Sequence, residues 1–256
     1  MTFIVLALLL LAPSQEDQRP RAPQFNREYF DLAAKTGGDF YFWSPGEFAA
    51  ARVQVPIHGE SVVLSYGSFE GKRLFEIPVE SGVKQLTLFA GIQRKDLTVL
   101  VRPDGTVVRD GVQLFQHMLI ATITSPLSGI WRLELDGAGA YAVTAHVKAA
   151  ADAPDLVSFE FVEPGGRPGH EGMFPIKRPL RSGESLACSL SLEGTVREAE
   201  LSFVTADGSV IATMPSTADR CSVPNVPFRV LVRGIDGKGS PFQRIESPLR
   251  EPIASH

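Results

Sequence analysis

Apolar and polar residues alternate in short runs along most of the chain from Val53 onward. Successive side chains of a β-strand point to opposite faces of its sheet, so a period of two is typical of strands buried on one side. In the first half of the chain we expect strands at Val62–Ser65, Arg73–Pro78, Gln85–Ala90, Leu97–Arg102, Met118–Thr124, Trp131–Leu135 and Tyr141–Val147. In the second half we expect them at Leu156–Val162, Glu184–Leu192, Ala199–Thr205, Ser209–Met214, Phe228–Ile235 and Gln243–Ile245.

Turn signals rich in Gly, Pro and Asp separate these strands. They stand at residues 80–82, 102–105, 126–129, 137–139, 193–194, 206–208 and 236–239. We interpret Asp104-Gly105, Asp207-Gly208 and Asp236-Gly237 as hairpin turns, since a calcium loop needs several converging oxygens and each pair brings one carboxylate. The turn at 137–139 is expected to join Trp131–Leu135 and Tyr141–Val147 into a hairpin.

Short strands without long helical crossovers indicate antiparallel sheets. The stretch Ala149–Pro154 is interpreted as a linker, with one series of strands on each side of it. The sequence therefore predicts an all-β chain made of two tandem antiparallel β-sandwiches.

A short helix is expected ahead of the strands. Asn26 can cap a helix at Arg27–Lys35, in which Phe30 and its apolar neighbours share one face. Gly37-Gly38 is a usual C-terminal stop signal. The N-terminal part of the chain is thus predicted to be a single helix that leads into the β region.

Aromatic residues follow this helix directly. Asp39–Trp43 is predicted to be a short strand with aromatic side chains on both faces. Tyr41 and Trp43 share one face and are the candidate ligand-facing aromatics, with packing against a neighbouring sandwich as the alternative interpretation. Trp131 and Tyr141 are interpreted as core residues rather than as a sugar-stacking platform.

Composition is that of an ordinary globular protein. Hydrophobic residues make up 44% of the 256 residues and charged residues 21%. The formal net charge is −4, and no segment concentrates Lys and Arg, which argues against a nucleic-acid partner.

The first residues form a separate unit. Phe3–Ala12 is an unbroken apolar run that is too short to span a bilayer. We expect a signal peptide at residues 1–14 and a polar leader at 15–27, so that the protein is secreted: extracellular, or periplasmic if bacterial. No Lys or Arg precedes the run, and the alternative is a buried strand in a gene model that starts late. No other stretch approaches ~18 uninterrupted apolar residues, so the chain is not expected to span a membrane.

Cys188 and Cys221 are the two cysteines. Neither belongs to a Cys-x-x-Cys pair, and no His stands at metal-ligand spacing from them, so zinc is not expected. In an exported chain they would form one disulfide, worth ~3 kcal/mol by the chain-entropy estimate, and two unpaired buried thiols are the alternative.

No motif for catalysis or metal binding is present in the sequence. His170-Glu171 lacks the second His of a zinc-protease helix, and Ser185 lacks the closing Gly of a nucleophile elbow. Gly67–Lys72 has one residue too few between its glycines for a P-loop. We therefore expect no catalytic residues, no metal, no cofactor and no enzymatic activity.

Three groups of residues together resemble a known order of domains. Residues 29–40 look like the end of a von Willebrand factor A domain, residues 75–79, 99–105 and 126–131 look like the galactose-binding-like sandwich after it, and residues 228–244 look like the closing hairpin of an immunoglobulin-like domain. From about Tyr29 to about Ile245 the chain thus resembles the region that follows the A domain in hemicentins and related A-domain proteins. No Asp-x-Ser-x-Ser occurs, so the A-domain body and its metal-dependent adhesion site are missing from this sequence.

The resemblance implies an organisation and a role. It implies an A-domain-tail-like helix and strands at 28–62, a galactose-binding-like, jelly-roll-like sandwich at 63–148 and an immunoglobulin-like sandwich at 155–248. It also implies a secreted, non-enzymatic interaction module associated with the extracellular matrix or cell-surface adhesion, with an extracellular protein or glycan as partner. The alternatives are a carbohydrate-binding module and an accessory fragment of a larger A-domain protein.

Overall fold

The computed structural model describes residues 25–43, 47, 59–167 and 169–254, so the predicted signal peptide and most of the polar leader lie outside the described residues. Its elements are α1 (Arg27–Thr36), β1 (Glu60–Val79), β2 (Gln85–Val101), β3 (Val112–Leu114), β4 (Met118–Thr124), β5 (Gly129–Lys148), β6 (Asp155–Gly165), β7 (Gly172–Pro175), β8 (Ser185–Glu193), β9 (Val196–Val204), β10 (Val210–Pro215), β11 (Arg220–Ser222), β12 (Arg229–Asp236) and β13 (Pro241–Ile245). These strands pair antiparallel throughout. The prediction of an all-β chain with antiparallel sandwiches is confirmed.

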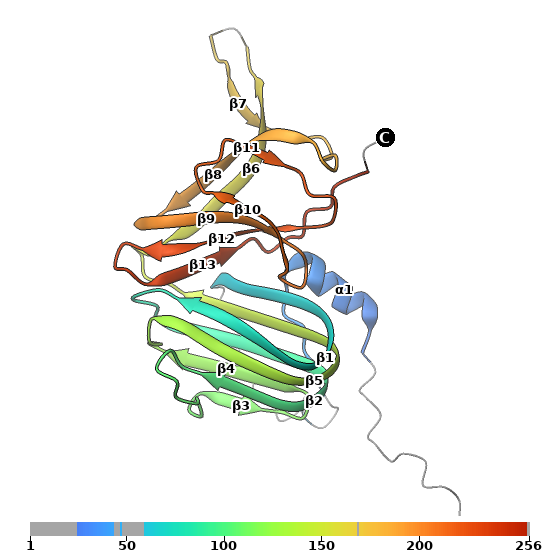
Figure 1. The fold of residues 1–256 in the computed structure, drawn as a ribbon, viewed down its shortest axis with the longest axis vertical. Coiled ribbons are helices and arrows are strands. Elements are labelled where there is room, and N and C mark those ends of the chain that lie inside the picture. The colour runs from blue at the N-terminus through green and yellow to red at the C-terminus, as the bar shows by residue number, and fades with distance from the viewer. Residues whose placement is uncertain (1–24, 44–46, 48–58, 168, 255–256) are drawn as a thin grey trace, which may run out of the picture.

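The first sandwich is made from one five-stranded sheet with the order β1-β5-β2-β4-β3. Its strands β1, β2 and β5 run for 17 to 20 residues, about three times the usual length. Each of them bends, so the sheet folds back on itself and its two halves form two layers (Figure 1). The core between the layers contains Val62 and Leu86 from one half and Ile77, Leu100 and Trp131 from the other, all at most 1% exposed.

The hairpin predicted around residues 137–139 is wrong, because β5 continues through these glycines as one strand. β1 and β2 likewise each contain two of the predicted strands. A Cβ on Gly137 would lie 2.1 Å from the carbonyl oxygen of Arg94, at the point where β2 bulges. Only glycine allows the backbones to approach this closely, so the glycines permit a bend here instead of a reversal.

The second sandwich consists of two separate four-stranded sheets, β10-β9-β12-β13 and β11-β8-β6-β7. Four phenylalanines meet in its core with ring centroids 4.9–6.4 Å apart, in edge-to-face or tilted pairs: Phe159, Phe161, Phe203 and Phe228. Such pairs add to the stabilisation that comes from burying the rings. The two layers therefore come from different strands, in contrast to the first sandwich.

Helix α1 forms where the sequence predicts it. The side chain of Asn26 accepts hydrogen bonds from the backbone N–H groups of Glu28 at 2.9 Å and Tyr29 at 3.4 Å, which satisfies donors that the helix cannot pair internally. Gly37 ends the helix in the left-handed conformation, with φ 75°. Phe30 is on the buried face, 8% exposed.

The buried face of α1 contacts both sandwiches. Phe30 clusters with Leu64 and Tyr66 of β1 and with Val204 and Ile245 of the second sandwich. Figure 1 shows the helix beside the junction of the two sandwiches. The helix therefore stabilises their relative placement by burying apolar surface from each.

Buried polar contacts also join the sandwiches. Arg244 of β13 donates from Nη2 to Oε1 of Glu80 at 2.6 Å, and it also pairs with Glu60. The side chains of Arg244 and Glu80 are only 3% and 0% exposed. Removing one partner of such a pair leaves an uncompensated buried charge, which is strongly destabilising. Gln243 additionally donates to the carbonyl oxygen of Val62 at 2.6 Å.

Candidate functional sites

The segment with the predicted ligand-facing aromatics lies on the outer face of the first sandwich. Residues 39–43 belong to no sheet, which corrects the predicted strand. Tyr41 and Trp43 stack on each other at 5.8 Å and are both partly buried. Tyr41 packs against the edge of Phe89, and Trp43 packs in the same way against Phe115. Both rings thus have packing partners on the sheet of the first sandwich, and contact with a ligand stays a prediction.

The opposite face of this segment is covered as well. Phe40 and Phe42 pack edge to face at 5.0 Å, and each also contacts Phe25. A Cβ on Gly91 would lie 2.5 Å from the Phe42 ring, so this glycine leaves the space that Phe42 fills. The segment is therefore held on two faces without pairing as a strand.

Asp39 begins the segment and joins a polar network on β1 and β5. His146 Nε2 lies 3.3 Å from Asp39 Oδ1, and Ser61 Oγ lies 3.3 Å from His146 Nδ1. The Asp39 carboxylate also accepts a hydrogen bond from Thr144 and lies 3.5 Å from the hydroxyl of Tyr41. Ser, His and Asp are the residue types of a hydrolase triad, although no spacing in the sequence brings them together.

The geometry of this network favours a positioning role. Ser61 and His146 are directly opposite each other in the register of β1 and β5, so their contact follows from strand pairing. The Asp39 carboxylate is already shared with other donors. Ser61 lines neither the cavity where the long strands of the first sandwich bend nor the two cavities between the sandwiches. We therefore assign the network to holding Asp39 and the aromatic segment on the sheet.

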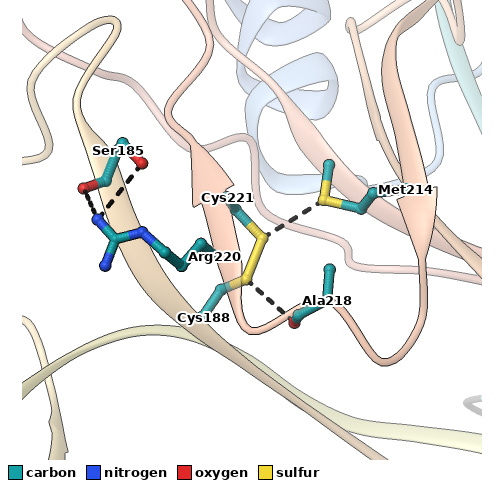
Figure 2. Close-up of a disulfide and its surroundings, with 6 residues drawn as sticks. All are labelled: Ser185, Cys188, Met214, Ala218, Arg220 and Cys221. Carbon is teal, nitrogen blue, oxygen red and sulfur yellow. Dashed lines mark hydrogen bonds between the residues drawn. A yellow bond between two sulfur atoms is a disulfide. The ribbon is translucent and has the colours of Figure 1, made fainter.

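The two cysteines are joined in a disulfide, Cys188–Cys221, with Cα atoms 5.9 Å apart. The bond links β8 to the three-residue strand β11, its neighbour in the same sheet. Figure 2 shows that Arg220 lies across these two strands, where it donates to the carbonyl oxygen of Ser185 at 3.0 Å. An immunoglobulin domain with the usual disulfide has it between its two sheets, so this bond differs from that arrangement.

A trough of 610 Å³ crosses the bend of the first sandwich. It passes over β1, β5 and β2 and reaches the loop before β4. Its lining includes side chains of both charges: Glu70, Gly71, Arg94, Lys95, Asp96, Gln116, His117, Asp136, Gly137 and Ala138. Because it lies where three strands bend together, the trough is a direct product of the bent sheet.

Two titratable groups of the trough are perturbed. Burial lowers the pKa of Lys95 below its usual 10.5, and attraction to Glu47 offsets this only in part. Burial also lowers the pKa of His117 below 6.5, so that its ring is neutral at neutral pH. Among the residues that the structure describes, His117 Nδ1 is buried without a hydrogen-bond partner. Perturbed and unsatisfied groups gathered in one concavity are typical of functional sites.

A hairpin arm made of β6, β7 and the loop between them extends from the second sandwich (Figure 1). β7 is an edge strand, and all four of its residues are exposed. Met173 is 52% exposed and Phe174 is 46% exposed. An exposed edge with large apolar side chains is a surface on which another chain can dock.

Neither a metal centre nor a membrane span is found in the parts of the chain that the structure describes. There, no three His, Cys, Asp or Glu side chains converge as ligands of an ion. Within the same residues, no helix has the length and apolar composition for crossing a bilayer.

Comparison with known proteins identifies no family. No family model matches the chain, and no curated protein does. Similar solved structures include the propeptide form of the Bacillus licheniformis lipase BlEst2 (12% identity, TM-score 0.35, 75% of this chain and 41% of the lipase) and a DUF4785 family protein from Legionella pneumophila (10%, 0.40, 80% and 71%). A β-1,2-glucanase from Parabacteroides distasonis is a third (8%, 0.25, 75% and 34%). This chain spans less than half of the lipase and of the glucanase. These likenesses are too distant to carry a conclusion about function, and the resemblance to hemicentins stays a prediction.

The trough and the arm were not predicted from the sequence. Arg94-Lys95-Asp96 is the one available signal for the trough, since three charges interrupt what is otherwise an apolar strand. For the arm, the Gly- and Pro-rich stretch at 165–172 predicts a loop, but nothing in it shows that the neighbouring Met and Phe stay exposed.

Proposed function

We propose that this protein is a secreted, non-enzymatic interaction module, hemicentin-like in organisation, with a role in extracellular matrix or cell-surface adhesion. Its partner is proposed to be an extracellular protein that docks on the hairpin arm. The observation that supports this is the exposure of Met173 and Phe174 on the edge strand β7, which pairs with β6 on one side and with no described strand on the other.

Edge strands usually avoid such exposure. Natural sheets protect an edge with charge, proline or a covering element, because unpaired N–H and C=O groups attract other strands. On β7 only Pro175 at the end of the strand fits that pattern, and the apolar pair precedes it. A partner that adds a strand and covers the two side chains would satisfy both the backbone groups and the apolar surface.

The disulfide supports export. Disulfides persist in oxidising compartments and are rare in the cytosol. Cys188 is 8% exposed and Cys221 is 3% exposed, so the bond is shielded once formed. This agrees with the proposed extracellular or periplasmic location.

The proposal is tested by a binding screen. The full chain is exported from an oxidising host and applied to panels of matrix and cell-surface proteins. We expect saturable binding that Met173→Ser combined with Phe174→Ser weakens by about tenfold or more. The matched control is Val210→Ser with Ile211→Ser, which removes two side chains of similar exposure (55% and 37%) from the edge strand β10.

Binding that survives the arm variant, or that the control variant weakens equally, would contradict the proposed docking surface. Hydrolysis of a substrate by the purified chain would contradict the non-enzymatic assignment. The alternative function predicted from the sequence is a carbohydrate-binding module. The feature that favours it is the trough at the bend of the first sandwich.

A further inference from the structure

Lys95 has donor capacity that the described structure does not use. Its Nζ donates to the carbonyl oxygen of Phe115, whereas an ammonium group carries three donors. Lys95 is only partly exposed, and Glu47 contributes attraction that does not outweigh the cost of burial. A partly dehydrated ammonium with free donors is a favourable place for an anionic oxygen.

The charges along the trough are not uniform. Arg94 and Lys95 on β2 are its two cationic side chains, and Asp96 follows them on the same strand. Glu70 and Asp136 lie across the neighbouring strands β1 and β5, and Asp136 is 4.0 Å from Lys72 outside the lining. A ligand that matches this pattern carries one anionic group and several hydrogen-bond donors.

Hydroxyl groups are the donors that fit best. A carboxylate such as Glu70 or Asp96 accepts hydrogen bonds only, and neither side chain forms a hydrogen bond or ion pair within the part of the chain that the structure describes. A ring with several hydroxyls can donate to them. A densely anionic chain such as a nucleic acid is disfavoured, because three acidic side chains line the trough.

The lining also leaves open space at one glycine. Gly71 lies in the lining, and a Cβ added there would meet nothing within 4 Å. Open space above a glycine leaves room for a flat or puckered ring against the backbone. The charged side chains of the lining and the open space at Gly71 together suit a sugar.

We propose that the trough binds a sugar that carries a single carboxylate, with Lys95 holding the carboxylate and Asp96 and Glu70 accepting hydroxyl hydrogen bonds. This inference deepens the carbohydrate-binding candidate and is independent of the arm. It places the ligand at the bend of the first sandwich, and not on the rings of Tyr41 and Trp43.

The experiment uses the full disulfide-bonded chain and, as probe, a trisaccharide of two neutral sugars and one uronate. Binding is followed by calorimetry and by backbone amide shifts. We expect saturable binding with the largest shifts at residues 94–96, 116–117 and 136–138, which line the trough. A neutral trisaccharide and inorganic phosphate are the comparison ligands and should bind at least about tenfold more weakly, the size expected for one charge-assisted contact.

Variants separate the role of Lys95 from a loss of folding. Lys95→Met should weaken uronate binding by about tenfold or more, and Lys95→Arg should retain most of it. Lys148→Met is the matched control, since Lys148 is an exposed lysine at the far end of β5. Affinity should also fall as the pH rises toward the pKa of Lys95, which burial places below 10.5.

Three outcomes would overturn the proposal: no uronate binding, equal binding of the neutral sugar, or equal binding of phosphate, which would mark a simple anion site. The arm variant Met173→Ser, Phe174→Ser should leave uronate binding unchanged. The experiment therefore distinguishes failure of the proposed sugar site from failure of the proposed docking surface on the arm.

Discussion

The two sandwiches reach the same layered architecture by different routes. The first folds one sheet of long strands over itself, so each of β1, β2 and β5 contributes to both layers. The second stacks two sheets of shorter strands and adds the disulfide Cys188–Cys221. In the first, continuity of the strands connects the layers, and in the second, side-chain packing and the hydrogen bonds of Arg250 to Phe228 and to the Phe159 carbonyl oxygen do so.

Because of this difference, the stability of each sandwich depends on different residues. A bent sheet depends on the residues that fill the space between its layers and on the glycines that allow the bend. A stacked pair of sheets depends on its core rings and on whatever holds its short edge strands. Both Trp residues, Trp43 and Trp131, belong to the first half, so Trp fluorescence reports on that half only.

The largest effect is expected for Trp131→Ala. Trp131 is 1% exposed in the core of the first sandwich, and its Nε1 donates to the carbonyl oxygen of Leu127 at 2.8 Å. Losing this ring should reduce the free energy of unfolding by about 3–5 kcal/mol. Urea denaturation followed by circular dichroism measures the change. A stable variant that has lost ligand binding would instead mean that Trp131 is a contact residue and not a core residue.

Removal of the disulfide should cause the second-largest loss of stability, and this loss should fall on the second sandwich. Cys188→Ala with Cys221→Ala opens a loop with a sequence separation of 33, which costs ~3 kcal/mol in the chain-entropy model. Hydrogen exchange should accelerate first in β8 and β11. Mass spectrometry of the wild-type chain with an alkylating reagent is the control, since two reactive thiols without reductant would show that the bond is absent.

Gly137→Ala tests the bend itself. A Cβ at this position would lie 2.1 Å from the backbone of Arg94, so the strands must move apart, at a cost of about 1–3 kcal/mol. Gly71→Ala is the matched control with open space, although its φ of 91° carries some strain of its own. If Gly137→Ala is no more destabilising than Gly71→Ala in urea denaturation, close approach is not what the bend requires.

The same glycines mark the limit of prediction from sequence. Alternation placed the strands, and the turns at Asp104, Asp207 and Asp236 form as predicted, with backbone hydrogen bonds that close each one. Around Gly137 the same kind of signal accompanies a continuous strand. A pair of glycines indicates that the backbone departs from regular strand geometry. Whether the chain bends or reverses there depends on its neighbours, and β5 continues because it pairs with β1 on one side and with β2 on the other.

The candidate sites were less predictable for a related reason. The helix follows from local capping by Asn26 and Gly37. The trough brings together residues from β1, β2, β5 and the loop before β4, and no local pattern connects them. Tyr41 and Trp43 were singled out as aromatics, but their packing on Phe89 and Phe115 depends on the path of residues 39–43 across the sheet.

The smallest effect is expected at the contact between the two halves. The carbonyl oxygen of Asp207 in the second sandwich accepts hydrogen bonds from Ser65 at 2.7 Å and Arg73 at 3.0 Å, both on β1. Burial raises the pKa of the Asp207 carboxyl, but hydrogen bonds from Thr205 and Ser209 outweigh burial, so the pKa lies below 3.8.

A carboxyl whose pKa is lower in the folded state than in the unfolded state stabilises the folded state at pH values above the unfolded-state pKa. This contribution is lost as the pH falls through the folded-state pKa. Acidification below pH 3.8 should therefore loosen the Asp207 turn. Asp207→Asn should show a shallower loss of stability than the wild type in urea denaturation over this acidic range. Parallel curves would mean that the carboxyl does not support the contact. The two halves would then be joined chiefly by the Arg244–Glu80 pair and by the apolar cluster around helix α1.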